Sequence, residues 1–159
     1  MTSATITEFP TAPLIKRLLA FLYDLFILGA LSMVYSALAT VIMVFVIGDQ
    51  GTGDYQPMQQ GLWFQSGWVI TIVGFYWLFW RRAGQTVGMR AWHLKLVDQN
   101  GHPVSHTQIL RRIISGPISL AVLGLGYWWC LFDQDQRAWH DIASSTKIIE
   151  TPKIKKEKK

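Results

Sequence analysis

The run from Leu18 to Ile47 most constrains how this chain can fold, because thirty consecutive residues contain one charged side chain, Asp24. A helix of that length extends about 45 Å, whereas the hydrocarbon core of a bilayer is about 30 Å thick. The run therefore predicts a membrane-spanning helix that either tilts or keeps its first turns in the interface. In the second case, Asp24 and the preceding Arg17 lie at the headgroup boundary.

The composition of the chain is typical of a small polytopic membrane protein. Of its 159 residues, 50% are hydrophobic and 16% are charged, and the mean hydropathy is +0.23. The eight tryptophans fit aromatic belts at the two membrane interfaces. The net charge is +5, but a soluble nucleic-acid-binding protein would not contain thirty-residue apolar runs. We therefore expect membrane lipids as partners and no nucleic acid.

A second span follows from Leu62 to Trp80, which is nineteen residues without a charge. From the end of this span to Arg112 the chain has six basic residues and one acid, Asp98. By the positive-inside rule this loop is cytoplasmic, the polar connector 48–61 is outside, and the N-terminus is inside. We expect four basic side chains to face lipid headgroups: Arg81, Arg82, Arg111 and Arg112.

The cytoplasmic loop contains a signal for extended structure. Residues Ala91 to Asp98 alternate loosely between apolar and polar, and Asn100-Gly101 is a strong turn signal. We expect a short β-like hairpin or extended segment here.

A third apolar segment, from Ile113 to Phe132, allows two topologies. If it crosses the membrane fully, the lysine-rich tail lies outside, which violates the positive-inside rule. If it is a re-entrant hairpin that turns at Gly124–Gly126, both of its ends stay inside, but its backbone must be buried in protein or line a cavity. Both alternatives remain open.

The expected fold is therefore an all-α membrane protein with two transmembrane helices and this third apolar segment. The β-like hairpin lies between the second helix and that segment. We divide the chain into a flexible N-terminal tail (1–13), a membrane domain (14–150) and a basic C-terminal tail (151–159).

Asp24 is the first candidate functional residue. A carboxylate at membrane depth costs about 2.5 kcal/mol or more, so an acid there is a site hypothesis by default. Arg17 is seven residues earlier, on the same helical face and about 10.5 Å away along the axis. That separation is too large for direct contact, so each residue is expected to find a partner elsewhere in the chain.

Several blocks of the sequence together point to a known family. They are Arg17 to Ala20 with Asp24, Gly84 to Met89, Leu94 to Asp98, Gly101 to Ser105, Arg111-Arg112, and Arg137 to Ala143 with Thr146. In this order they resemble the RDD family of small membrane proteins, which is named after one arginine and two aspartates. The resemblance implies that these three residues are Arg17, Asp24 and Asp141, and Asp133 is a further acid in the same region.

Two functions are compatible with the resemblance. Some family members have been proposed to be sodium/proton antiporters, alone or as paired subunits. On that model Asp24 exchanges a proton for a small cation, Arg17 tunes its pKa, and Asp141 or Asp133 is the second acid. Alternatively, Arg17, Asp24 and Asp141 form a structural polar cluster in a non-transporting membrane adaptor or assembly subunit.

The remaining sequence features argue against other classes of function. No nucleophile–base pair is evident, so we expect no enzyme and no cofactor. His102 and His106 are four residues apart, but Pro103 argues against a helix there and we expect no metal site. Because two or three spans rarely enclose a path alone, we expect a homo-oligomer or a paired subunit. We place the protein in a bacterial cell (inner) membrane as a multi-pass protein with a cytoplasmic N-terminus.

Overall fold

The computed structural model describes residues 10–47, 61–122, 124–133 and 135–152 of the chain. The elements, in order, are α1 (Leu14–Ile47), α2 (Leu62–Ala83), α3 (Val87–Ala91), β1 (Leu94–Asp98), α4 (His106–Ala121), α5 (Leu125–Trp128), the 3-10 helix η3 (Trp129–Leu131), α6 (Trp139–Ser144) and β2 (Thr146–Glu150). The expected outer connector, the first nine residues and the lysine-rich end of the tail lie outside the described residues.

The two long helices confirm the two predicted spans. Both α1 and α2 are long and apolar enough to cross a membrane, and most of their large apolar side chains are exposed, as contact with lipid requires. The second half of α1 contacts the start of α2 through polar groups. Tyr35 donates to the carbonyl of Phe64 (2.8 Å), and the Trp68 indole donates to Ser32 (2.9 Å). Helix α2 ends at Gly84, whose φ of 66° is a conformation that glycine adopts without strain.

The third apolar segment is bent. Helix α4 begins with a capping box in which the Ser105 and Gln108 side chains each bind the other residue's backbone N–H. The chain bends by 106° between the helical segments that start at His106 and Leu125. The bend lies next to Gly124, whose φ is 72°. Gly126 then lies so close to Ser119 that a Cβ there would be 2.6 Å from the serine Cβ. The segment therefore turns back on itself, close to the predicted turn, and is not one straight crossing helix.

The extended segment expected after the second span forms as β1, whereas the alternative, a local hairpin, does not form. The backbone does turn after Asp98, whose carboxylate accepts the N–H groups of Asn100 and His102, but helix α4 follows in place of a second strand. The partner of β1 is β2, which pairs antiparallel with it in the register Leu94 to Glu150 and Asp98 to Thr146. The turn lies where the sequence predicts it, but a turn alone does not determine which strand pairs with β1.

Residues 10–12 pair with the last strand of the sheet. Thr11 forms a bridge with Ile149, and the Ala12 N–H donates to the carbonyl of Ile148 (2.8 Å). The Glu150 N–H in turn donates to the carbonyl of Pro10 (3.1 Å). The segment 10–12 is thus attached to the free edge of β2, and both ends of the described chain lie at the same end of the molecule.

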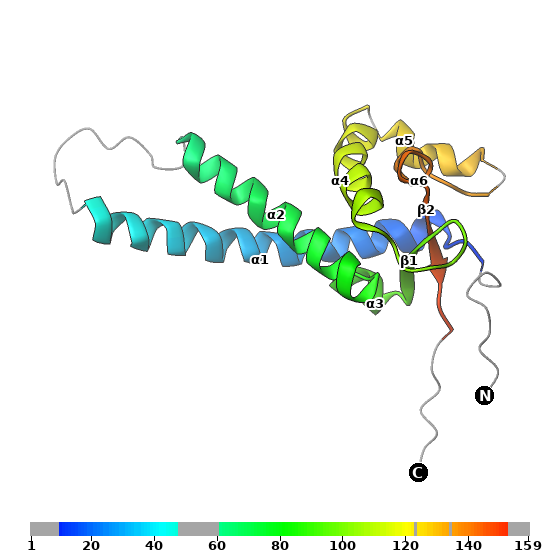
Figure 1. Ribbon diagram of the computed structural model, residues 1–159, viewed down its shortest axis with the longest axis horizontal. Coiled ribbons are helices and arrows are strands. Elements are labelled where there is room, and N and C mark those ends of the chain that lie inside the picture. Colours follow the sequence, from blue (N-terminus) through cyan, green and yellow to red (C-terminus); the bar gives the residue numbers. More distant parts are fainter. Residues whose placement is uncertain (1–9, 48–60, 123, 134, 153–159) are drawn as a thin grey trace, which may run out of the picture.

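The main core is at this end and not between the long helices. Figure 1 shows α1 and α2 extending together from a cluster formed by α3 to α6 and the two strands. Fully buried side chains here include Leu94, Leu96, Ile109 and Ile149. The small cluster therefore has an apolar core of its own, against which the first turns of α1 are packed.

The strand pairing can be tested with a disulfide in a Cys130→Ser background. Val97 and Lys147 are register partners, and the Cα atoms of such antiparallel partners are about 4.5–5.5 Å apart, within the range for a disulfide. We expect the pair Val97→Cys and Lys147→Cys to cross-link under mild oxidation, measured by gel mobility. The control pair, Val97→Cys with Glu150→Cys, is about 10 Å out of register and should stay reduced. Equal cross-linking of both pairs would contradict the register.

Candidate functional site

Arg17 lies in the first turns of α1 and its side chain is buried, with 6% of its surface exposed. Its Nη1 donates to Oδ2 of Asp141 at 2.7 Å, and its Nε donates to the carbonyl of Ala12 at 2.9 Å. Its Nη2 donates to the carbonyl of Gln136 at 3.0 Å. One guanidinium therefore joins the start of α1 to the segment around α6, which is more than a hundred residues later in the chain.

Asp141 binds a second guanidinium. Arg112, from α4, places its Nη1 2.5 Å from Oδ1 of Asp141 and 2.7 Å from the hydroxyl of Thr146 at the start of β2. The backbone N–H of Ala138 completes the set by donating to Oδ2 at 3.0 Å. We call Arg17, Arg112 and Asp141 the triad; it connects α1, α4 and α6.

The charges of the triad do not cancel. Burial by itself would raise the pKa of the Asp141 carboxyl, but Arg112, Arg17 and the Ala138 N–H lower it more, and its pKa is about 2. The neighbouring His140 is neutral, because burial and then Arg112 lower its pKa to about 3. Two guanidinium groups and one carboxylate leave a net charge of +1 in a buried position.

Asp24 belongs to a separate contact. The Thr86 hydroxyl and the Gly88 backbone N–H (2.8 Å) donate to its carboxylate, which is buried with 3% of the residue exposed. Both donors belong to the start of α3, and α3 is so close to α1 that a Cβ on Gly88 would be 2.1 Å from the carbonyl oxygen of Ala20. Arg17 and Asp24 each have a partner distant in sequence, as their spacing predicted, but they do not share one.

Asp133 does not reach the triad in the described part of the chain. It follows η3 and accepts hydrogen bonds from the Arg137 side chain (3.1 Å) and backbone N–H (2.9 Å). These contacts lower the pKa of the Asp133 carboxyl below its ordinary value. Of the two acids proposed as the second member of the site, Asp141 is the one that contacts Arg17.

The expectation that Arg112 faces lipid is wrong. Arg81, Arg82 and Arg111 are exposed, whereas Arg112 has only 4% of its surface exposed and pairs with Asp141. The signal that could have found it is helical spacing, since Arg112 is three residues after Ile109 and shares the buried face of α4. Thr86, which is buried beside Asp24, is a further site residue that the sequence pattern does not single out.

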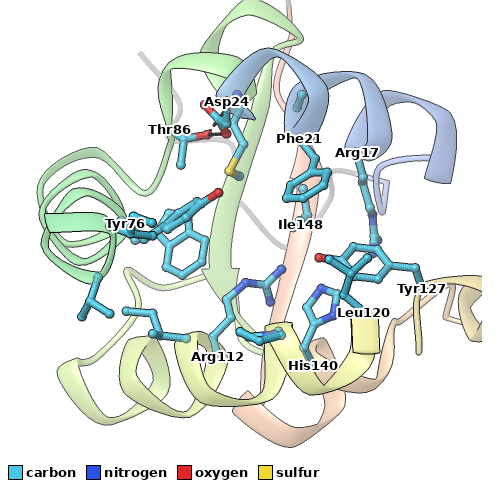
Figure 2. A pocket seen from close by; sticks show the side chains of 18 of the residues that line it. Arg17, Phe21, Asp24, Tyr76, Thr86, Arg112, Leu120, Tyr127, His140 and Ile148 are labelled. Carbon is cyan, nitrogen blue, oxygen red and sulfur yellow. Dashed lines mark hydrogen bonds between the residues drawn. The ribbon is translucent and has the colours of Figure 1, made fainter. Parts of the chain in front are cut away.

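A cavity of about 470 Å³ lies between α1, α2, α4 and α6. Arg17, Asp24, Arg112 and His140 border it, and the rest of its wall is mostly apolar or aromatic. In Figure 2, Asp24 and Thr86 are on one wall and Arg112 with His140 on the opposite wall. No group of three His, Cys, Asp or Glu residues comes together anywhere in the described ranges.

The triad predicts an asymmetry between two acids that are close in sequence. Asp141→Asn leaves two buried guanidinium groups without a counter-charge, and breaking a buried pair in this way costs about 3–5 kcal/mol. We expect a large drop in the free energy of unfolding, measured by denaturant titration in detergent. Asp133→Asn removes a partly exposed pair and is the control, with a much smaller loss. Equal losses in the two variants would contradict the role of the triad.

Comparison with known proteins identifies the family of the chain. No curated protein and no solved structure shows significant similarity to the chain. The sequence model of the RDD family, however, matches residues 11–145, which include both acid contacts and both arginines of the triad. This match covers most of the chain, and the protein is therefore a member of the RDD family of membrane proteins.

Proposed function

We propose that this membrane protein has a transport-related role in which Asp24 exchanges a proton for a small cation at the cavity wall. The observation that carries the proposal is that Asp24 is the one acid among the described residues lining the cavity. It sits in a helix apolar enough to span a membrane. An acid in that position is costly and is typical of proton and ion pathways.

The surroundings of Asp24 offer oxygen ligands. The Thr86 hydroxyl binds its carboxylate, and Tyr76 of α2 lines the same cavity. Small hard cations prefer carboxylate, hydroxyl and carbonyl oxygens. A cation that replaced the proton on Asp24 would therefore find two neighbouring oxygen donors.

The role expected for Arg17 changes in this proposal. Because its guanidinium is bound to Asp141, Arg17 influences Asp24 only through the charge it contributes to the cavity wall. The exchanging group is Asp24 alone, and the triad is the support that fixes the opposite wall. Two spans and a bent segment do not enclose a path, so we further propose assembly with a second copy or another membrane subunit. We place this assembly in a bacterial inner membrane, with the N-terminus in the cytoplasm.

A second candidate is a non-transporting adaptor or assembly subunit. The triad favours this second candidate, because its hydrogen bonds join three segments that are distant in sequence. These hydrogen bonds therefore have a structural use. In that case the cavity has no transport role, and the exposed basic side chains beside the spans serve to bind partners or lipid headgroups. Neither candidate requires catalysis, and we propose no enzymatic activity.

Exchange can be tested with purified protein in vesicles carrying a pH-sensitive dye. We expect sodium or potassium gradients to drive proton flux that is abolished by Asp24→Asn, because the amide cannot take up and release a proton at the pH of the assay. Asp133→Asn is the matched control, as this acid lies away from the cavity, and its flux should equal that of the wild type.

Two results would count against exchange. No cation-driven flux in the wild type would remove the first candidate. Loss of folded protein from the membrane in Asp24→Asn, with normal melting of Asp133→Asn, would show that the contact of Asp24 with α3 is structural and favour the second candidate.

A further inference from the structure

The cavity wall opposite Asp24 carries the net positive charge of the triad. Both side-chain hydrogen bonds that Arg112 donates use Nη1, and its Nε and Nη2 have no partner among the described residues. Figure 2 shows the guanidinium of Arg112 pointing into the space between the helices. Since the triad has a net charge of +1, this edge of Arg112 is suited to an acidic group.

Two further buried polar atoms border this wall. The Trp80 indole nitrogen Nε1 and the His140 nitrogen Nδ1 have no hydrogen-bond partner among the described residues. Trp80 lies next to Arg112, whose guanidinium is 5.5 Å from the centroid of the indole ring. A buried polar group without a partner is destabilising, and both residues line the same cavity as Arg112. A polar group bound by Arg112 would therefore have further hydrogen-bonding atoms in the same wall.

The rest of the cavity is apolar and elongated. Its wall continues along α2 from Trp80 back to Val69, about 16 Å along the helix axis, and along α4 through Pro117 and Leu120. The volume of about 470 Å³ equals that of roughly sixteen water molecules at liquid density. This space has room for one hydrocarbon chain of about a dozen carbons.

We propose that the cavity binds a single-chain amphiphile with an acidic headgroup, carboxylate or phosphate. The headgroup accepts hydrogen bonds from Nε and Nη2 of Arg112, with Trp80 and His140 beside it. The chain lies between α2 and α4 against Val69 and Leu120. This inference does not depend on cation exchange, because it uses the wall opposite Asp24.

Binding can be measured on the full chain in a sterol-based detergent, which has no linear alkyl chain, with radiolabelled dodecanoate in equilibrium dialysis. We expect saturable binding of one molecule per chain, at least tenfold tighter than that of dodecanol, because the alcohol lacks the charge. Dodecyl phosphate should compete with dodecanoate, and dodecyltrimethylammonium should not. Absence of saturable binding, or equal affinity for dodecanol, would overturn the proposal.

Matched variants locate the headgroup. Arg112→Lys keeps the positive charge beside Asp141 but loses the free Nε and Nη2 donors, and we expect at least a tenfold loss of affinity. Arg111→Lys, the exposed neighbour, should bind as the wild type does. If Arg112→Lys fails to fold, Trp80→Phe is compared with Trp77→Phe, and only the former should weaken binding several-fold. Equal effects within either pair would place the headgroup elsewhere.

A last measurement identifies the source of the amphiphile. Lipid extracted from the purified protein is analysed by mass spectrometry, and we expect a single-chain acid that is depleted in the Arg112→Lys or Trp80→Phe preparation. A diacyl phospholipid bound at one per chain and displaced by dodecanoate would overturn the single-chain assignment. Asp24→Asn should bind dodecanoate at least as tightly as the wild type even if it abolishes ion flux, because it removes a negative charge from the cavity wall, and this separates the proposal from the exchange function.

Discussion

The structure depends most on one carboxylate held between two guanidinium groups. Asp141 is fully buried and binds Arg17 from α1 and Arg112 from α4. The same Arg112 nitrogen reaches Thr146 at the start of β2, so one contact orients the first span, the bent segment and the sheet. Taking these charges out of water is costly, and only the complete set of partners offsets that cost. The arrangement therefore holds only when segments from both ends of the chain are in place.

Asp24 provides the second fixed point of α1, and the cavity lies between the two. The carboxylate binds the start of α3, which leads directly into β1, while Arg17 binds α6. The first span is thus fixed on two sides about two helical turns apart. Helices α2 and α4 close the space between these points with apolar side chains, which leaves a cavity with an acid on one wall and excess positive charge on the other. Both proposed activities follow from this distribution of charge.

Much of the fold was accessible from the sequence, because the bilayer imposes length and polarity on its spans. The uncharged runs located α1 and α2, and the glycines near residue 124 located the bend. The need for partners of Arg17 and Asp24 followed from their spacing alone. The strand pairing did not, since the partner of Leu94 is Glu150 and a nearby turn signal favoured a local hairpin. Local turn chemistry cannot exclude a partner that becomes available only after the chain has folded back.

The partner of Arg112 was inaccessible for a related reason. Helical spacing places Arg112, and not Arg111, on the buried face of α4, but only the direction of α4 relative to α6 decides that this face meets Asp141. The grouping of Arg17 with Asp24 failed similarly, because a shared helical face does not imply a shared partner. In each case the missing information was the tertiary arrangement of a buried charge, which composition and periodicity do not encode.

The central claim is that Arg17 is coupled to Asp141 and not to Asp24, and a pair of double-mutant cycles tests it directly. The free energy of unfolding is measured for Arg17→Met, Asp141→Asn, Asp24→Asn and the two double variants that contain Arg17→Met. The structure predicts a coupling energy on the order of 2 kcal/mol for Arg17 with Asp141 and additivity within about 0.5 kcal/mol for Arg17 with Asp24. Strong coupling to Asp24 together with additivity at Asp141 would contradict the account.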